Sequence, residues 1–405
     1  MSEKVYVVGT GIISAIGRNT DETVESLLNS RSGISPIELL PTVHRHKLPA
    51  GEIKYSNAQL AAWSGCHASV SRTALLALLA AREAKQSAGI SEWNSLRTGL
   101  ISATTVGGMD RTEIFMTEFI ENPTRGRLRD VIYHDCGAST EIIADTLGIK
   151  DFITTISTAC SSSANAIMYG ARLIKHNRLD VAIAGGADAL SAFTTNGFSA
   201  LMILDPEPCK PFDANRKGLN LGEGAGYLTL VSERVAKQLK LNVLCELTGY
   251  GNANDAYHQT ASSPEGTGSL LAMQAALQCS QLRPTDIDYI NLHGTGTSNN
   301  DLSEGKAIKK LFSNSIPPIS STKSFTGHTL GASGGIEAVI SVLAMKHQVV
   351  FPNLRFSQPI EELSLIPVTS PEKRNIRHVM SNAFGFGGNC CALIFSKTHP
   401  DERVH

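Results

Sequence analysis

The chain alternates short apolar runs with stretches whose apolar residues recur every three or four positions. The run at 153–156 is β-branched, and the positions after it follow helical spacing at Ala164, Ile167, Met168, Ala171 and Ile174. This pattern predicts a strand followed directly by a helix. Other apolar runs are equally short and are also separated by helical patterns. The chain is therefore predicted to have an α/β fold with largely parallel sheets.

Four segments in the first part of the chain have counterparts, in the same order, in the second part. "KVYVVGTGIIS" from position 4 is similar to "VLCELTGYGNA" from 243, and "TGLISATTVGG" from 98 is similar to "IDYINLHGTGT" from 287. "DVAIAGGADALSAF" from 180 is similar to "HVMSNAFGFGGNCCALIF" from 378, and the strand-to-helix junction at 160 corresponds to "STKSFTGHTLGASGG" from 321. Four matches in one order predict a duplicated fold with halves at 1–240 and 241–405.

Composition and charge exclude several classes of partner. Of the 405 residues, 42% are hydrophobic and 18% are charged, and the formal net charge is −1. This balance gives no general attraction to nucleic acid or to a membrane surface. The longest apolar run, 74–81, is far shorter than the roughly 20 residues of a membrane helix. The opening "MSEKVYVVGTGII" lacks the features of a signal peptide and is predicted to be a strand.

The eight cysteines do not form a C-x-x-C pair, which argues against a zinc site or a redox dithiol. Reduced thiols in a cytoplasmic protein are the better interpretation. Cys160 differs from the others because it lies between the predicted strand and the predicted helix. A helix start presents free N–H groups and partial positive charge, which stabilise a thiolate. The alternative for Cys160 is a buried structural cysteine.

Two histidines and a lysine follow glycine-rich turns in the second half. His293 stands at the end of the apolar run 287–292, and Lys323 and His328 lie five residues apart on either side of Gly327. Each has a structural alternative when taken alone. Together with a thiol they suggest acyl transfer followed by carbonyl activation, because neutral imidazoles can donate hydrogen bonds to a thioester oxygen. A metal site is disfavoured because further ligands with suitable spacing are absent from the sequence.

Taken in order, these segments resemble the β-ketoacyl-acyl-carrier-protein synthases, the elongating condensing enzymes of the thiolase superfamily. "STACSSS" resembles the family's nucleophile segment, "HGTGT" and "STKSFTGHTLGASGG" resemble its two histidine segments, and "SNAFGFGG" resembles its C-terminal glycine loop. "PFDANRKGLNLGEGAG" resembles a further family stretch, so the likeness runs nearly end to end. It implies a duplicated thiolase fold with five layers, αβαβα, and usually a homodimer.

The resemblance implies a role for each residue of the centre. Cys160 would carry the acyl chain, while His293 and His328 promote decarboxylation of a malonyl thioester on acyl carrier protein. The product would be a β-ketoacyl carrier protein and CO₂, as in fatty-acid elongation. Lys323 would orient the site, with Glu304 as its acidic partner. The backbone N–H of Phe386 would be the second oxyanion donor beside that of Cys160, and its ring would gate the acyl pocket.

The resemblance also implies sites around this centre. Asp255 and His258 fall where the family has a mobile loop beside the gate. A structural monovalent cation, seen in some members, would be bound by Asn291, Glu337, Ser381 and Asn382. A resident cofactor is not implied, because 4′-phosphopantetheine arrives on the carrier protein.

Three departures from the family pattern concern the cavity and the carrier. Lys217 stands where the family usually has an acidic residue, and Leu219 where it has an aromatic one. Asn389 stands in place of a common threonine. An acidic carrier needs a basic surface, and the segment 59–81 provides only Arg72. The docking surface is therefore predicted at Arg125, Arg127, Arg129 and Lys210.

Four alternatives remain open at this point. The first is a free-standing ketosynthase of a type II polyketide or polyene pathway, with the same chemistry. The second is a non-decarboxylating thiolase that uses Cys390 or Cys391 as a second cysteine. The third is a dinucleotide-binding protein, based on "VVGTGIIS" at 7–14. The fourth is a non-catalytic partner subunit such as a chain-length factor. The presence of Cys160 and both histidines counts against it, but a heterodimer with a chain-length-factor-like subunit stays open.

Overall fold

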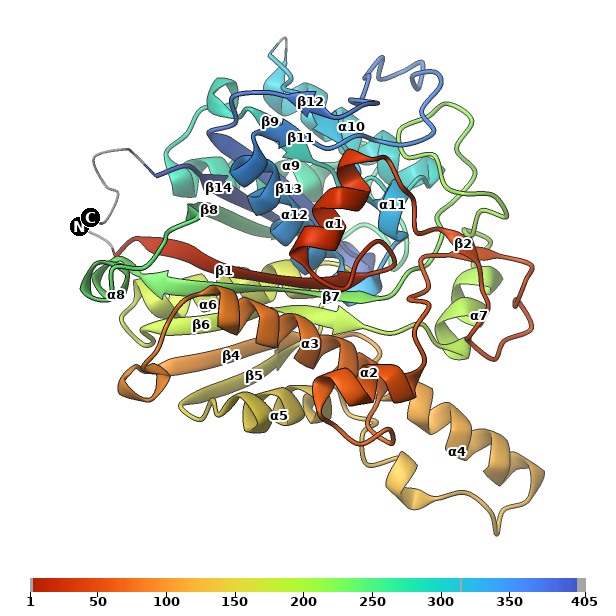
Figure 1. Cartoon of the computed structure of the whole chain (residues 1–405). Coiled ribbons are helices and arrows are strands. Elements are labelled where there is room, and N and C mark those ends of the chain that lie inside the picture. The colour runs from red at the N-terminus through yellow and green to blue at the C-terminus, as the bar shows by residue number, and fades with distance from the viewer. Residues whose placement is uncertain (1–2, 314, 399–405) are drawn as a thin grey trace.

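The computed structural model describes residues 3–313 and 315–398. The first half contributes five adjacent strands of the large sheet, and they lie side by side in the lower part of Figure 1. Their spatial order is β5 (Phe152–Ile156), β4 (Thr98–Ala103), β6 (Val181–Asp188), β7 (Gly224–Ser232) and β1 (Val5–Ser14). The second half contributes β10 (Ile319–Ser320), β9 (Tyr289–Asn291), β13 (His378–Phe384), β14 (Asn389–Ser396) and β8 (Cys245–Asn254).

The two halves have the same topology. Numbered by chain order within each half, the strands follow the spatial order 3-2-4-5-1 in both. The pairing directions also agree, with parallel pairs around β4 and β9 and antiparallel pairs around β7 and β14. The halves meet where β1 pairs antiparallel with β8. The predicted duplication is therefore confirmed. In each half four of the five strands run in one direction, as the prediction of largely parallel sheets expected, and β7 and β14 are the antiparallel exceptions.

Helices and sheets stack in five layers, as the resemblance implied. One hydrophobic cluster joins α6 (Ser162–Lys175) and α12 (Ser333–His347) to both halves of the sheet. A second joins α3 (Arg72–Ser87) and α5 (Cys136–Leu147) to the outer face of the first half. A third joins α9 (Thr267–Ser280) and α10 (Ser298–Phe312) to the second half. The α/β prediction with αβαβα layering is confirmed, and Figure 1 shows α12 above β1, between the two sets of strands.

Shorter elements complete the fold. The remaining helices are α1 (Thr20–Leu28), α2 (Asn57–Ser64), α4 (Met109–Glu121), α7 (Ala192–Ala200), α8 (Glu233–Gln238) and α11 (Lys323–Thr326). The remaining strands are β2 (Ser35–Pro36), β3 (Pro49–Ala50), β11 (Val349–Val350) and β12 (Glu372–Lys373). The division expected at 240/241 falls between α8 and β8, and its boundary stays a prediction. In the part of the chain that the structure describes, every helix is too short or too polar to cross a membrane.

The dinucleotide alternative is wrong because its glycines lie inside a strand. Gly9 and Gly11 belong to β1, which is buried along its whole length. A Cβ at Gly9 would lie 2.2 Å from the carbonyl oxygen of Ala84, and one at Gly11 would lie 2.0 Å from that of Ala80. These glycines allow α3 to pack directly on the strand, so the motif has a packing role and does not form a phosphate loop.

Candidate active site

The nucleophile candidate lies in the tight connection between β5 and α6. Ala159 has φ +52°, in the left-handed region, which turns the chain sharply before Cys160. The Ser162 hydroxyl fixes this turn, because it accepts from the backbone N–H of Thr158 at 2.8 Å and donates to the carbonyl of Ala159 at 2.5 Å. Cys160 is thereby placed just before the first turn of α6, where it is 6% exposed.

The C-terminal glycine loop closes over this turn. A Cβ at Gly385 would lie 3.1 Å from both the backbone nitrogen of Cys160 and the carbonyl oxygen of Thr158, so glycine permits the close approach. The next residue, Phe386, places its backbone N–H beside the sulfur, as does Cys160 itself. Two convergent N–H groups can hold an oxyanion formed on an acyl group at this sulfur. The ring of Phe386 stacks on Phe198 of α7, with centroids 5.7 Å apart.

Burial dominates the acidity of the thiol. It raises the pKa of Cys160 to about 11, against the opposing effects of the Phe386 N–H and the Lys323 charge. The expectation that the helix start holds a resting thiolate is therefore not met, because desolvation of the anion costs more than the nearby amide dipoles return. Cys160 rests as a thiol.

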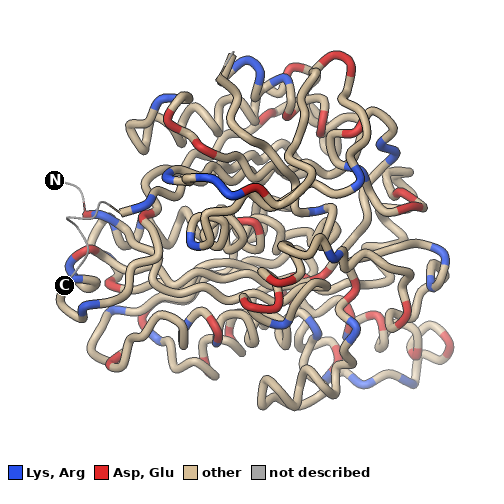
Figure 2. Tube along the Cα trace, turned by 45° about the horizontal axis from the view of Figure 1, so that its top comes forward, with Lys and Arg blue, Asp and Glu red and all other residues tan. Residues whose placement is uncertain are grey.

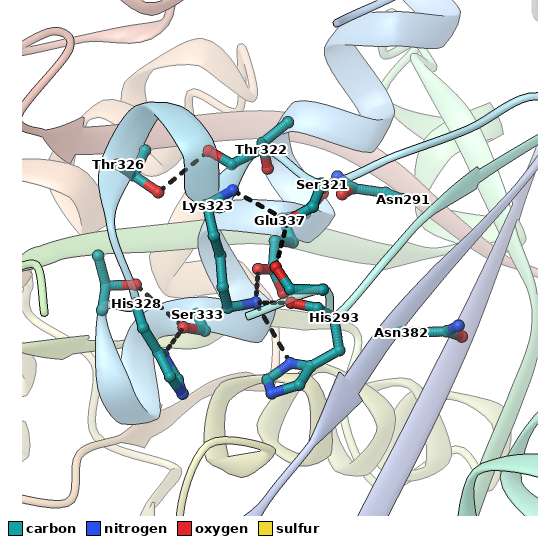
Figure 3. Close-up of polar contacts among 12 residues, drawn as sticks. Asn291, His293, Ser321, Thr322, Lys323, Thr326, His328, Ser333, Glu337 and Asn382 are labelled. Carbon is teal, nitrogen blue, oxygen red and sulfur yellow. Dashed lines mark hydrogen bonds and ion pairs between the residues drawn. The ribbon is translucent and has the colours of Figure 1, made fainter. Parts of the chain in front are cut away.

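His293 is held by Lys323 (Figure 3). The Lys323 Nζ lies 3.2 Å from Nδ1 of His293, donates to the carbonyl oxygen of His293 at 2.6 Å, and pairs with Glu337. An ammonium group has three N–H donors, and here each has an acceptor. Because Lys323 donates to Nδ1, the proton of the neutral ring lies on Nε2.

The acidic partner of Lys323 was predicted wrongly. It is Glu337, from the buried helix α12, and not Glu304. Glu304 instead accepts from the backbone N–H groups of His293 at 2.9 Å and Gly294 at 2.8 Å, and from the Asn382 amide at 3.0 Å. Burial raises the pKa of both carboxyls to about 7. The sequence could not separate the two glutamates, since both lie on helices that reach this loop.

His328 is fixed in the same tautomer. Its Nδ1 accepts from the backbone N–H of Leu330 at 3.2 Å and lies 2.9 Å from the Ser333 hydroxyl. The ring proton therefore lies on Nε2, as in His293. The two rings meet edge to face with centroids 5.4 Å apart. Burial, and then the charge of Lys323, lower the pKa of both imidazoles well below the ordinary value, so both are neutral donors.

The predicted centre converges on one cavity of about 250 Å³. Cys160, His293 and His328 line it together with Phe384 and Phe386, while Lys323 lies behind His293. Asp255 also lines it. His258 is exposed and is absent from the residues that line this cavity in the described structure.

Two further cavity features bear on the earlier predictions. Cys390 lines the cavity, as a second thiol would in the thiolase alternative, but burial raises its pKa to about 12. Cys391 lies entirely in the core.

The Asn389 side-chain oxygen accepts from Ser161 at 2.7 Å and from Asn165 at 2.7 Å, so this departure from the family pattern ties the glycine loop to α6.

The proposed docking residues lie apart from the cavity wall. Arg125, Arg127 and Arg129 are exposed after α4, which projects from the body of the molecule in Figure 1. Lys210 is half-buried and pairs with Glu207 at 3.3 Å. Along the trace, Lys and Arg are interspersed with Asp and Glu (Figure 2). The geometry leaves docking at these four residues a prediction.

Three buried oxygen atoms fit the implied cation site in part. Asn291 Oδ1, Glu337 Oε2 and Asn382 Oδ1 are buried without a hydrogen-bond partner, and oxygen is the ligand that hard cations prefer. Asn291 pairs directly with Ser381 across β9 and β13. Within the described residues, a cluster of three or more His, Cys, Asp or Glu suited to a metal ion is not found. The set therefore suits a weakly bound monovalent ion better than a transition metal.

Comparisons with known proteins agree with this site. Residues 2–236 match the family model described as "Beta-ketoacyl synthase, N-terminal domain", and 244–357 match its C-terminal domain. The chain is 35% identical to 3-oxoacyl-[acyl-carrier-protein] synthase 2 of Staphylococcus aureus (strain COL), over 98% of this chain and 99% of that one.

Solved structures share the whole fold. The ishigamide ketosynthase/chain length factor superposes with a TM-score of 0.92 at 28% identity, over 98% of this chain and 100% of that one. A type II PKS acyl-carrier protein in complex with its ketosynthase gives a TM-score of 0.89 at 26% identity, with coverage of 98% and 100%.

Proposed function

Since the chain belongs to the β-ketoacyl synthase family and is a condensing enzyme of the acyltransferase class, we propose that it elongates an acyl chain on acyl carrier protein by decarboxylative Claisen condensation. The observation that carries this proposal is the single cavity in which Cys160 meets two neutral histidines. The S. aureus relative, named for a carrier-protein substrate, supports the choice of carrier.

The first half-reaction transfers the acyl group to Cys160. The sulfur attacks the thioester carbonyl, and the N–H groups of Cys160 and Phe386 hold the oxyanion. The bond to the arm sulfur then breaks, and the thiol proton ends on the released arm. Because the resting group is a thiol, proton removal accompanies the attack.

The second half-reaction extends the chain. The Nε2–H groups of His293 and His328 donate to the thioester oxygen of a malonyl unit, which stabilises the enolate as CO₂ leaves. The enolate carbon attacks the acyl group on Cys160, the carbon–sulfur bond breaks, and the departing sulfur takes up a proton from solvent. The released product is a β-ketoacyl carrier protein. Lys323, Glu337 and Glu304 are positioning residues for His293.

The decisive experiment separates the two half-reactions. Wild type, Cys160→Ala and His293→Ala are incubated with acyl- and malonyl-carrier proteins, and intact mass, CO₂ and product are measured. We expect an acyl adduct on wild type and on His293→Ala, none on Cys160→Ala, and condensation only in wild type. Condensation at the wild-type rate in Cys160→Ala would end the proposal.

We place carrier docking at Arg125, Arg127, Arg129 and Lys210. The exposed arginines can approach acidic side chains of a carrier. Helix α4 contacts the start of α7 through Glu113, which accepts from the backbone N–H of Ala192, and Phe198 of α7 lines the cavity. Reversing the three arginine charges to glutamate is expected to raise KM for carrier substrates and leave pantetheine thioesters unaffected. An equal rise in KM for carrier substrates and for pantetheine thioesters would contradict docking at these residues.

The neighbouring residues complete the proposal. Asp255 accepts from the Ser263 and Gly268 backbone N–H groups, which anchors the start of a loop that includes His258 and lies beside Phe386. Asn291, Glu337, Ser381 and Asn382 would hold a monovalent cation that stiffens the loop behind His293. The reaction as written requires no resident cofactor, because phosphopantetheine arrives on the carrier.

The runner-up is a type II polyketide or polyene ketosynthase with the same chemistry. The likeness to the ishigamide ketosynthase/chain length factor favours it, and it would pair this chain with a related subunit instead of a second copy. A panel of saturated, polyenoyl and β-ketoacyl carrier thioesters distinguishes the two through the adduct mass on Cys160. A cytoplasmic location follows from either pathway and stays a prediction.

A further inference from the structure

One lysine side chain lines the catalytic cavity, among the described residues, and it lies at the mouth. Lys217 belongs to the same cavity wall as Cys160 and both histidines. The lining residues differ in exposure: the floor around Cys160, His293 and His328 is buried, while Lys217 and Asn299 are exposed. Lys217 therefore stands at the rim, where a substrate arm enters.

The backbone that carries Lys217 is held on both sides. Arg216 donates to the carbonyl oxygens of Thr297 at 3.2 Å and Ser298 at 3.0 Å. The backbone N–H of Leu219 donates to the carbonyl oxygen of Ile203 at 2.9 Å. The position of Lys217 at the rim is thus fixed, while its ammonium group has no ion pair or hydrogen bond with the part of the chain that the structure describes.

Lys217 forms no ion pair with a carboxylate of the cavity wall among the described residues. Asp255 is the one carboxylate among the lining residues described, and it already accepts from the Ser263 N–H at 2.6 Å, the Ser263 hydroxyl at 2.7 Å and the Gly268 N–H at 2.8 Å. Both histidines are neutral. The ammonium group of Lys217 is therefore free to pair with an anion at the mouth.

The proposed reaction brings two anions to this cavity. The malonyl carboxylate is next to the reacting thioester and so belongs on the buried floor. The phosphate of the 4′-phosphopantetheine arm lies at the opposite end of the arm and so belongs at the mouth. We infer that Lys217 pairs with this phosphate and makes the enzyme prefer a phosphorylated arm. This inference rests on the proposed function and adds a specificity residue to it.

The test compares two thioesters that differ by one phosphate. The rate constant for acylation of Cys160, at substrate concentrations well below saturation, is measured with acyl-4′-phosphopantetheine and acyl-pantetheine. We expect wild type to favour the phosphorylated arm about threefold, the order of one exposed ion pair, and this preference to decline in high salt. Lys217→Ala should lose it, Lys217→Arg should keep it, and Lys217→Glu should invert it. Lys237→Ala, in exposed α8, is the matched control and should behave as wild type.

Several outcomes would overturn the inference. One is a preference for the phosphorylated arm that persists in Lys217→Ala. Another is a wild-type enzyme that shows no preference for the phosphorylated arm. A third is a Lys217→Ala defect confined to decarboxylation of malonyl-pantetheine, which would assign the charge to the malonyl carboxylate. Lack of a Cys160 adduct with any thioester would instead refute the proposed function, so the two failures are distinguishable.

Discussion

At the scale of single residues, the chemistry of the centre depends on which groups are neutral. Burial makes Cys160 a thiol and keeps His293 and His328 uncharged. Hydrogen bonds to each Nδ1 then leave both Nε2 protons free for a substrate oxygen. The site therefore stabilises developing negative charge with donors that carry no full charge of their own.

The thiol's raised pKa predicts its reactivity. Alkylation of Cys160 by iodoacetamide should accelerate about tenfold per pH unit from pH 7 to 10, because the thiolate fraction rises at that rate below a pKa of about 11. Mass mapping of the modified peptide measures the rate, with Cys160→Ala as the background. A plateau below pH 9 would show that the amide dipoles outweigh desolvation.

The buried Glu304 predicts a pH-dependent stability. Burial raises its pKa from 4.5 to about 7, so the folded protein binds a proton that the unfolded chain releases, and the carboxyl's contribution declines as pH rises from 4.5 through 7. Relative to Glu304→Gln, wild type should lose about 1 kcal/mol of unfolding free energy between pH 6 and 7.5.

Urea titrations of both proteins at the two pH values measure this difference. Both proteins contain the same histidines, whose lowered pKa values change stability with pH in the opposite direction. Comparing the two proteins cancels this contribution of the histidines to the unfolding free energy. Glu92→Gln, at an exposed position, is the control and should show no such change. A pH-independent gap between wild type and Glu304→Gln would refute the raised pKa.

At the scale of elements, close packing of helices on strands positions the centre. Gly226 of β7 faces α12, where an added Cβ would lie 2.4 Å from the backbone nitrogen of Ile336. α12 also carries Glu337 and Ser333, which hold Lys323 and His328. The separation between this strand and this helix therefore sets the geometry of both histidines.

Gly226→Ala should push α12 away from β7. We expect a loss of about 2–3 kcal/mol in unfolding free energy, the cost of overpacking a dense core, and a lower condensation rate with Cys160 acylation retained. Gly137→Ala in α5 is the matched control, because a Cβ there meets nothing within 4 Å. Equal stability of the two variants would contradict the packing argument.

The elements also show where prediction from sequence succeeded and where it failed. Cys160, His293 and His328 were singled out because each lies at a glycine-rich or small-residue turn, a local signal, and the ordered family motifs then gave each a role. The pairing of Lys323 with Glu337 was missed because the contact spans 14 residues and depends on how α12 crosses the sheet. The one antiparallel strand of each half, β7 or β14, was also missed, since a buried antiparallel strand and a buried parallel strand have the same apolar pattern.

At the scale of the whole molecule, apolar surface remains uncovered on the single chain. β5 is at one end of the strand order, with Ile153 42% exposed. On α4, Ile120 is 74% exposed, and Leu128 after it is 77% exposed. An edge strand and exposed apolar side chains are each features of an interface.

The molecule is therefore expected to form a two-chain assembly. Native mass spectrometry should show twice the mass of the chain, or this chain with a related subunit. Ile153→Lys should shift the equilibrium toward the single chain because it places a charge on the β5 edge. A fully active single chain at micromolar concentration would contradict this prediction.

Sequence by itself determined the α/β class and the duplication and singled out Cys160, His293 and His328 as candidates, because strand and helix periodicity, ordered repeats and turn residues are local properties. The tertiary structure decided the charge states, the partner of Lys323, the strand directions and the position of Lys217 at the rim. These depend on burial and on contacts between distant segments, which set the solvation of each group and which a linear pattern does not encode.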